Sequence, residues 1–336
     1  MSARMRAAVW DGAGLRCTTV PVPEVAEGWT LVRVSHVGLC GTDLAIVGGW
    51  HPRAAPPLVL GHEFSGAVAH PGGRFAAGTP VVVEPLLTCG ACWACRHGAA
   101  HVCAHLGLLG IDAPGALAEL VAVPEDRLHP VADTVAPATA AWVEPLAVAV
   151  HAVAAAPPAP GDVVAVFGGG PIGVLTALVA RHEGAGSVLV HEPNAARAAV
   201  VADLGFAVET DPDAFAVRIA AATGGEGAAV VFEAAGHPAA AAMLAAVGRV
   251  HATLVVVGVH KQPAAVDLQR LTFAEQRLVG VRVYTSEDFR RAVGLVVTGA
   301  LPLDRLPTTV LPLRRAAAAV DAARSGTDAL KVVVTP

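Results

Sequence analysis

The feature that most constrains this chain is a glycine-rich turn between an apolar run and a helical pattern. Val163–Phe167 is uncharged and rich in valine, as in a strand that is buried on both faces. The segment GGGPIG at Gly168–Gly173 follows, matches G-x-G-x-x-G and opens a helical pattern that ends near Glu183. Glycines let backbone amides approach a pyrophosphate, and the helix N-terminus adds a positive dipole end. The segment therefore predicts dinucleotide binding rather than a plain tight turn.

After this turn the predicted elements alternate between strands and helices. Strands are expected over Ser187–His191, Ala228–Glu233, Thr253–Gly258 and Arg277–Val283. Helices are expected over Ala195–Leu204, Val217–Ala222 and Pro238–Val247. Such alternation implies right-handed crossovers, so the predicted fold class is α/β, with a doubly wound parallel sheet of the Rossmann kind.

The first ~130 residues instead have the pattern of a β-rich region with many turns. Short apolar runs are found over Thr30–Val34, Gly66–Ala69, Pro80–Val83 and Ala118–Val123. Helices are expected over Pro145–Ala156, Asp288–Val297 and Arg314–Arg324, and a last strand over Leu330–Val334. Two regions of different pattern in 336 residues predict two domains.

Composition and charge exclude several classes of partner. Hydrophobic residues make up 54% and charged residues 15%, so a compact globule is expected. The net charge of −5, without a block of like charges, argues against nucleic-acid and membrane partners. The first residues, MSARMRAAVW, lack an apolar signal-peptide core, and glycines interrupt the uncharged run Val163–Ala180. We therefore expect a cytoplasmic protein that acts on a small molecule.

Four of the six cysteines are clustered. They are Cys89, Cys92, Cys95 and Cys103, with the spacing C-x2-C-x2-C-x7-C. Four thiolates can close a tetrahedron around Zn²⁺ with no open position, which makes a structural site. The long last gap, with no proline after Cys103, matches an iron–sulfur cluster less well. Reduced buried thiols or a redox pair are the alternatives to structural zinc.

A second set of candidate metal ligands is dispersed along the chain. Cys40 offers a thiolate and His62 an imidazole. Glu63 or Glu144 can complete the set with a carboxylate, directly or through water. Three protein ligands and one open place for water or substrate are the pattern of a catalytic zinc.

Two neighbours of Cys40 in the sequence suit supporting roles. The Asp43 carboxylate can hold the far nitrogen of His62, a contact that would fix the imidazole ring. The Thr42 hydroxyl is placed to relay a proton from a zinc-bound alcohol. Cys40, Thr42, His62, Glu63 and Glu144 are therefore the candidate catalytic residues.

One acidic residue bears on the choice of cofactor. Glu192 ends the strand after the glycine turn, nineteen residues beyond Gly173. A carboxylate there accepts hydrogen bonds from ribose hydroxyls and repels a 2′-phosphate, which favours NAD over NADP. Arg197 is close enough to keep NADP as an alternative. The other cofactor-binding candidates are Gly168, Gly170, Pro171, Ile172, Gly173, Gly258 and Val259.

In their joint order these motifs resemble the zinc-containing medium-chain dehydrogenases/reductases, and within them the butanediol, sorbitol and threonine dehydrogenase branch. The matching stretches are GLCGTD at Gly38–Asp43, LGHEFSG at Leu60–Gly66, VEPLLTCGACWAC at Val83–Cys95, VEPLAVAVHAV at Val143–Val153, VFGGGPIG at Val166–Gly173 and YTSEDF at Tyr284–Phe289. They span nearly the whole chain and keep the order of the family.

This resemblance implies a particular domain arrangement and ligand set. Residues 1–147 and 287–336 would form a GroES-like catalytic domain with a structural-zinc lobe at about 86–106, and residues 148–286 a Rossmann domain. Cys40 and His62 would bind the catalytic zinc, with Glu63 and Glu144 alternating as the further ligand. The cofactors would be two zinc ions per chain and NAD, and the assembly a homodimer or homotetramer.

The implied reaction is hydride transfer between NAD(H) and a secondary alcohol or its ketone. A vicinal diol or acyloin of the 2,3-butanediol kind is the first choice, because YTSEDF and VEPLLTCG look most like that branch. A cyclitol or amino-cyclitol is the second choice, and threonine or a sugar alcohol the third. A non-catalytic module that binds zinc and a dinucleotide is the competing class, and metal analysis would separate it from the enzyme.

Two departures from the family pattern bear on proton relay and substrate. Ala45 stands where many alcohol dehydrogenases carry the histidine of the outer proton relay, so His51 and the ribose hydroxyls are the substitutes. Val283 stands where sorbitol dehydrogenases tend to have arginine, and Arg282 would point the opposite way in a strand. The second departure favours a short diol or another less polar substrate over a long polyol. The candidates for lining the substrate pocket are Trp50, His51, Leu109 and Tyr284.

Overall fold

A computed structural model describes residues 3–70, 73–326 and 329–336. The chain divides into two compact units, one formed by Met1–Glu144 with Thr285–Pro336 and the other by Pro145–Tyr284. The boundaries expected at 147/148 and 286/287 lie within three residues of these. Among the described residues, every helix is too short or too polar to cross a bilayer.

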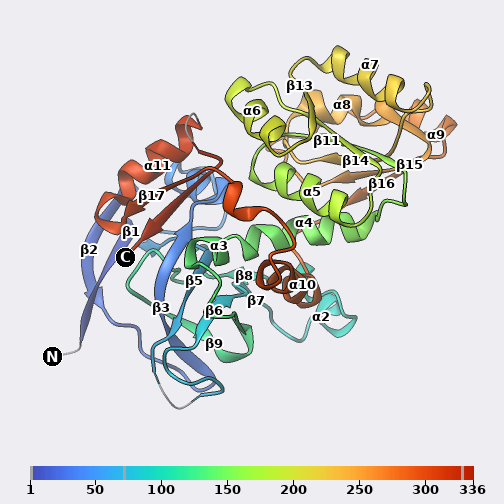
Figure 1. The fold of residues 1–336 in the computed structure, drawn as a ribbon. Helices are drawn as coiled ribbons and strands as arrows, with labels where there is room; N and C mark the ends of the chain where they lie inside the picture. Colours follow the sequence, from blue (N-terminus) through green and yellow to red (C-terminus); the bar gives the residue numbers. More distant parts are fainter. Residues whose placement is uncertain (1–2, 71–72, 327–328) are drawn as a thin grey trace. The chain divides into compact units, whose positions relative to one another are not determined.

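The unit Pro145–Tyr284 is built on a parallel sheet with the strand order β13-β12-β11-β14-β15-β16 (Figure 1). Its strands are β11 (Val163–Phe167), β12 (Ser187–His191), β13 (Ala207–Glu209), β14 (Ala228–Glu233), β15 (Gly248–Val256) and β16 (Arg277–Gly280). Its helices are α5 (Pro171–His182), α6 (Ala195–Asp203), α7 (Pro212–Ala222), α8 (Pro238–Val247) and α9 (Leu268–Phe273). The order reverses next to β11, which confirms the predicted doubly wound sheet.

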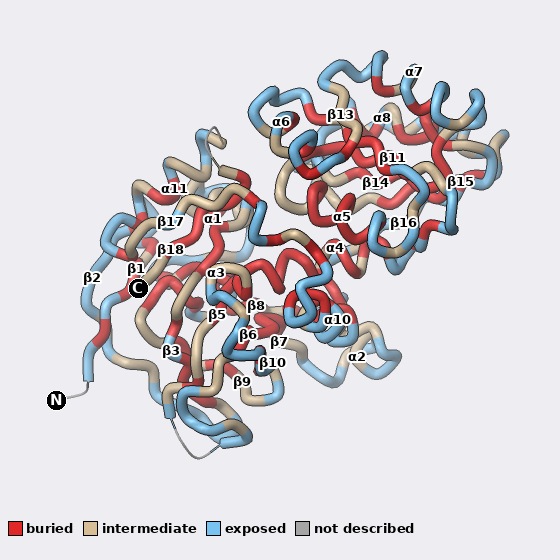
Figure 2. Tube along the Cα trace, in the orientation of Figure 1, coloured by how far each residue is buried: buried red, intermediate tan, exposed pale blue. Residues whose placement is uncertain are grey.

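This sheet is buried because its strands are apolar on both faces. All residues of β14 are buried, and so is α5 from Gly173 to Ala180 (Figure 2). Phe167, Phe215 and Leu244 belong to one core cluster that joins β11, α7 and α8. Burying apolar surface stabilises a fold by about 25 cal/mol per Å² removed from water, so this core is the main support of the unit.

The other unit is β-rich, as the sequence predicts. Among its described residues, one sheet has the order β10-β6-β5-β3-β18-β17 with β9 also paired to β3, and another has the order β2-β1-β4. The strands are β1 (Arg4–Trp10), β2 (Leu15–Pro21), β3 (Trp29–Gly38), β4 (Leu58–Val59), β5 (Glu63–Val68), β6 (Pro80–Val83), β7 (Leu86–Leu87), β8 (Gly107–Leu108), β9 (Leu120–Pro124), β10 (Leu128–Pro130), β17 (Thr308–Pro312) and β18 (Lys331–Thr335). The helices are α1 (Gly41–Val47), α2 (Trp93–Arg96), α3 (Pro137–Ala140), α10 (Ser286–Val297) and α11 (Ala316–Ser325), and α4 (Val143–Ala155) carries the chain into the other unit.

The strand β3 organises this unit. It pairs antiparallel with β5, with β9 and with β18. In these registers Gly38 lies opposite Glu63 on one side and opposite Val333 on the other. The last strand of the chain therefore lies close to the start of β5, although the two are far apart in sequence.

Two elements of the parallel-sheet unit start five residues earlier than expected. β15 begins at Gly248 and ends at Val256, whereas a strand over Thr253–Gly258 was expected. α7 begins at Pro212 and not at Val217, because the Asp211 carboxylate caps it by accepting the N–H of Ala214 at 2.8 Å. The apolar pattern alone therefore missed the polar beginnings of both elements.

The expected strand over Arg277–Val283 is wrong in its last residues. β16 ends at Gly280, and Val283 has a φ of 44°, in the left-handed region. Arg282 and Val283 consequently do not alternate along a strand. Their directions therefore give no reason to prefer a short diol over a long polyol.

Candidate metal centres and dinucleotide site

Three predicted ligands lie together where β3 ends and β5 begins. One ligand atom each from Cys40, His62 and Glu63 lies within 4.8 Å of the other two. Cys40 precedes α1, His62 precedes β5 and Glu63 begins it. The antiparallel pairing of Gly38 with Glu63 brings the end of one strand to the start of the other. A thiol, an imidazole and a carboxyl group at this spacing are ligands that suit Zn²⁺.

Asp43 supports the cluster from the first turn of α1. Its buried carboxylate accepts the N–H groups of Cys40 at 2.9 Å and Gly61 at 3.3 Å. Its Oδ1 lies 3.7 Å from Nδ1 of His62, too far for a hydrogen bond but within reach of charge interaction. Burial lowers the pKa of His62, yet the Asp43 charge and a contact with Cys40 outweigh it and hold the pKa well above its ordinary value.

One member of the cluster, Lys331, was not predicted from the sequence. Its ammonium group pairs with Oε2 of Glu63, and the two side chains are only 4% and 2% exposed. Its Nζ also lies 5.6 Å from the ring centroid of Trp142. Burial lowers the pKa of Lys331, but the Glu63 carboxylate more than compensates and raises it. The available signal was a single lysine within an otherwise uncharged stretch, LKVVVTP at Leu330–Pro336.

The buried ion pair fits because residue 38 has no side chain. A Cβ at Gly38 would lie 2.4 Å from Oε2 of Glu63 and 2.7 Å from Cε of Lys331. Those separations are too short for non-bonded atoms. The first glycine of the GLCGTD motif therefore leaves room for a charge pair between β5 and β18.

The remaining predicted catalytic residues lie near this group. Glu144 is buried in the first turn of α4, and its charge contributes to raising the pKa of His62 and of Lys331. Thr42 Oγ1 lies 3.7 Å from Sγ of Cys40. Of the two candidate carboxylates, Glu63 is the one within 4.8 Å of the other ligand atoms.

The four clustered cysteines meet in a loop that the pairing of β7 with β8 closes. Their Sγ atoms lie 3.4 Å apart between Cys89 and Cys103 and 4.0 Å apart between Cys89 and Cys95. Four sulfurs around one zinc lie about 3.8 Å apart when each Zn–S bond is about 2.3 Å long. Backbone N–H groups lower the pKa of Cys92 to about 6, whereas desolvation and the neighbouring thiols raise that of Cys95 to about 12. A cation would relieve this mutual repulsion, so the cluster fits zinc.

The glycine turn joins β11 to α5. Gly168 has a φ of +104°, and a Cβ at Gly173 would lie 1.8 Å from the carbonyl oxygen of Gly168. Both positions therefore need glycine. Among the described residues, no atom lies within 4 Å of a Cβ built at Gly170, the residue before Pro171 and α5. The backbone there faces open space, and the first turn of α5 can meet a pyrophosphate at that point.

Glu192 braces this turn. It follows β12, its side chain is buried, and its Oε2 accepts the N–H of Gly169 at 2.8 Å. Its Oε1 accepts the N–H of Asn194 at 2.8 Å. Arg197 lies in the first turn of α6, where its backbone N–H donates to the side chain of Asn194. The acid expected at the ribose therefore also fixes the glycine turn.

The four predicted pocket residues have different environments. Trp50 is 70% exposed, whereas Tyr284 is fully buried. Leu109 lines an apolar pocket of about 330 Å³ that none of the three grouped ligands lines. His51 lies close enough to His62 for their charges to interact, and burial is the main cause that lowers its pKa. His51 is thus tied to the ligand group, while Leu109 faces a different pocket.

Two protein-family models match the chain. An alcohol dehydrogenase GroES-like domain matches residues 26–133, and a zinc-binding dehydrogenase domain matches residues 171–298. The first match covers β3, the grouped ligands and the four-cysteine loop. The second runs from α5 to α10 and includes every strand of the parallel sheet except β11.

Relatives of known activity and solved structures are similar over most of the chain. A 2-dehydro-3-deoxy-L-galactonate 5-dehydrogenase of Pseudoalteromonas atlantica is 39% identical over 286 residues, 83% of each chain. An L-threonine 3-dehydrogenase of Bacillus velezensis is 33% identical over the whole length of both. A Sinorhizobium meliloti structure bound to NADP has 31% identity, full coverage of both chains and a TM-score of 0.91. The 2R,3R-butanediol dehydrogenase of Bacillus subtilis has 27% identity, 99% coverage of both and a TM-score of 0.91.

Proposed function

We propose that this chain, which belongs to the zinc-binding dehydrogenases with an alcohol dehydrogenase GroES-like domain, transfers hydride between a nicotinamide dinucleotide and a secondary alcohol or its ketone. It is an oxidoreductase of the alcohol and polyol dehydrogenase kind, as the sequence predicted. The observation that carries the proposal is the group of Cys40, His62 and Glu63, three donors that leave a zinc ion one open position.

The donor chemistry of this group suits a catalytic zinc. Cys40 and His62 would hold the ion, and Glu63 is the nearest carboxylate to them. A bound zinc ion lowers the pKa of a hydroxyl group that it binds, so that the hydroxyl loses its proton near neutral pH. Thr42 Oγ1, 3.7 Å from Cys40 Sγ, is the hydroxyl that would receive and pass on this proton. His51, which is close enough to His62 for their charges to interact, is the group that would accept the proton next.

The four-cysteine loop would hold a second, structural zinc. Its donors are all sulfur and at tetrahedral spacing, so they leave no place for a substrate. A chain that acts by this mechanism therefore carries two zinc ions of different roles.

The nicotinamide cofactor would bind at the Gly168–Gly173 turn, with NAD as the main form. A buried carboxylate at Glu192, next to Gly169, disfavours an added 2′-phosphate. The similar Sinorhizobium meliloti structure is bound to NADP, so both forms belong in the assay.

The substrate we propose is a secondary alcohol with a hydroxyl or amino group on the adjacent carbon, first of all a vicinal diol or its acyloin. Threonine, 2,3-butanediol and a sugar acid carry this feature in common, and they are the substrates named for the similar proteins. A cyclitol or amino-cyclitol has the same feature.

A substrate panel tests this proposal. The zinc-loaded chain is assayed at the nicotinamide absorbance with 2,3-butanediol, acetoin, L-threonine, L-galactonate, myo-inositol and ethanol, each with NAD(H) and NADP(H). We expect kcat/KM for at least one vicinal substrate to exceed that for ethanol by about 100-fold, the discrimination that a site hydrogen-bonding a second polar group gives. No turnover of any of these by a chain that contains zinc would reject the function.

Replacing Glu192 by alanine should weaken NADH binding and relax the preference against NADP. We expect the Kd for NADH to rise about 10-fold, because the ribose loses a charged acceptor and the turn loses its brace. The Kd for NADPH should rise less than that for NADH, because removal of a like charge near the 2′-phosphate offsets part of the loss of the backbone contacts that brace the turn. Fluorescence titration with both nucleotides measures this, and Glu226→Gln on the exposed surface of the same unit is the control. An equal loss for both nucleotides would contradict the proposed role in selectivity.

A further inference from the structure

A buried carboxylate ends the strand β14. The side chain of Glu233 is fully buried, and its Oε1 accepts the N–H groups of Ala235 at 2.9 Å and Gly236 at 2.8 Å. Its Oε2 lies 3.0 Å from Nε2 of His260, whose side chain is 16% exposed. A buried carboxylate needs such partners, because an unpaired charge away from water is strongly unfavourable.

The main chain of the same residue binds a second loop. The carbonyl oxygen of Glu233 accepts the N–H groups of Val257 and Gly258, both at 2.8 Å. Glu233 therefore joins the loop after β14 to the loop after β15. His260 lies in the loop after β15, and it binds the Glu233 carboxylate that also accepts N–H groups of the loop after β14. It therefore adds a side-chain contact between the two loops.

The loops after β14 and after β15 pack so closely that a side chain at Gly258 would not fit between them. A Cβ at Gly258 would lie 2.3 Å from the backbone nitrogen of Gly236 and 2.7 Å from Oε2 of Glu233. The loop after β14 in turn meets the glycine turn, since a Cβ at Gly168 would lie 3.1 Å from the nitrogen of Ala235. If the Glu233 carboxylate moved, the two loops and the glycine turn would have to move with it. All three lie at the edge of the sheet where the dinucleotide would bind.

The position of these loops in the sheet indicates what they serve. Ligands of doubly wound sheets bind outside the carboxyl ends of the strands, where the strand order reverses. Here the order reverses between β11 and β14, so one half of a dinucleotide would lie over β12 and the other over β14 and β15. Val259, at the tip of the second loop, is 88% exposed and free to contact that second half.

We propose that Glu233 and His260 form a clamp that positions the Gly258–Val259 backbone for the nicotinamide half of the cofactor. His260 is a positioning residue in this clamp and does not touch the reacting atoms. The inference rests on the proposed use of a nicotinamide cofactor and adds a residue pair that the sequence did not single out.

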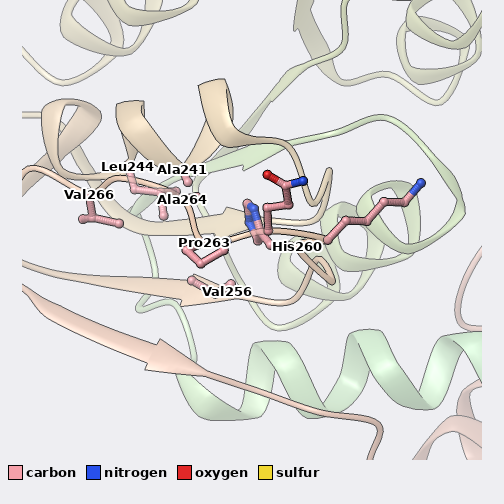
Figure 3. Close-up of a pocket in the computed structure, with 9 residues that line it drawn as sticks. Ala241, Leu244, Val256, His260, Pro263, Ala264 and Val266 are labelled. Atoms are coloured by element: carbon pink, nitrogen blue, oxygen red, sulfur yellow. The ribbon is translucent and has the colours of Figure 1, made fainter. Parts of the chain in front are cut away.

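On its other side, the His260 ring has no second hydrogen-bond partner among the described residues. Within the part of the chain that the structure describes, its Nδ1 is buried without a hydrogen-bond partner. The ring lines a pocket of about 390 Å³ together with Leu244, Val256 and Pro263 (Figure 3). Among the described residues, the bond to Glu233 is therefore the hydrogen bond that orients this ring.

Two substitutions at His260 separate positioning from general stability. His260→Gln keeps an N–H donor near the place of Nε2, whereas the shorter side chain of His260→Asn does not reach Glu233. The control is His251→Asn, which removes an exposed histidine–glutamate pair, with Glu275 at 3.8 Å, from the same unit. Residue 251 has a φ of 60°, which asparagine tolerates.

The measurement is the Kd for NADH of each zinc-loaded full-length variant by nicotinamide fluorescence, with zinc content and melting temperature recorded alongside. We expect His260→Asn to raise the Kd about 10-fold, His260→Gln to restore it to within about 3-fold, and His251→Asn to leave it unchanged. Zinc content should stay the same in all four proteins.

The outcomes distinguish this inference from the function on which it rests. Wild-type chain that binds NADH while His260→Asn binds it equally well would overturn the clamp alone. A loss of affinity that His260→Gln does not rescue would also overturn it, because the effect would not depend on the bond to Glu233. Failure of the zinc-loaded wild type to bind NADH would overturn the proposed cofactor and the clamp together.

Discussion

Replacing His62 by alanine is expected to lower kcat/KM for alcohol oxidation by at least about 1000-fold. His62 is buried, and its ring lies within 4.8 Å of Cys40 Sγ and a Glu63 oxygen. Loss of the imidazole removes one of three donors, and with it the several kcal/mol that a bound zinc ion contributes to stabilising charge in the transition state. Steady-state assay with the best substrate of the panel measures the effect.

A matched histidine in the same sheet is the control for His62. His36 lies in β3, is half-buried, and binds Ser35 through Nδ1 at 2.9 Å without belonging to the ligand group. His36→Ala should keep kcat/KM within about 3-fold of wild type, because surface and half-buried substitutions away from a site have small effects. Retained turnover in His62→Ala at saturating zinc would reject the catalytic assignment.

Replacing Lys331 by methionine is expected to destabilise the β-rich unit by about 3–5 kcal/mol. While no zinc occupies the Cys40, His62 and Glu63 group, the substitution leaves the Glu63 carboxylate buried without a cation, and breaking one side of a buried ion pair has costs of this size. Because the pKa of Lys331 is raised in the folded chain, the contribution of the charged lysine is fully present below the ordinary lysine pKa and is lost as the pH rises through the raised pKa. Urea unfolding at neutral pH measures the difference.

A second variant shows whether the charge pair causes this effect. The double variant Glu63→Gln with Lys331→Met removes both charges and should recover most of the lost stability, because two neutral groups need no mutual compensation. Lys331→Arg should stay closest to wild type. Equal destabilisation by Lys331→Met and by the double variant would mean that packing, and not the buried charge, determines the loss.

Much of the fold followed from local patterns. β11, β12, β14 and α8 have the expected bounds, because each is a short apolar or alanine-rich run between strong turn signals. β13 and α9 received no expectation, since β13 has only three residues and α9 has six. Such short elements depend on the neighbours they pack against, which local pattern does not reveal.

The sequence predicted the residues that the structure groups together, but it did not predict their surroundings. Cys40, His62 and the four cysteines stand in motifs whose spacing limits their chemistry. Lys331 reaches Glu63 through the pairing of β18 with β3, a contact between distant parts of the sequence. His260 was also missed because its contact joins distant parts of the sequence. It meets Glu233 because the parallel strands β14 and β15 end side by side.

The proposed mechanism requires one open-coordinated zinc and one closed zinc in each chain. Zinc content per chain after gel filtration, measured by mass spectrometry for the wild type and for Cys40→Ala, tests it most directly. We predict two ions in the wild type and one in Cys40→Ala, because the four-cysteine loop is intact in both. A single ion in the wild type, or two ions that survive the loss of Cys40, would contradict the account.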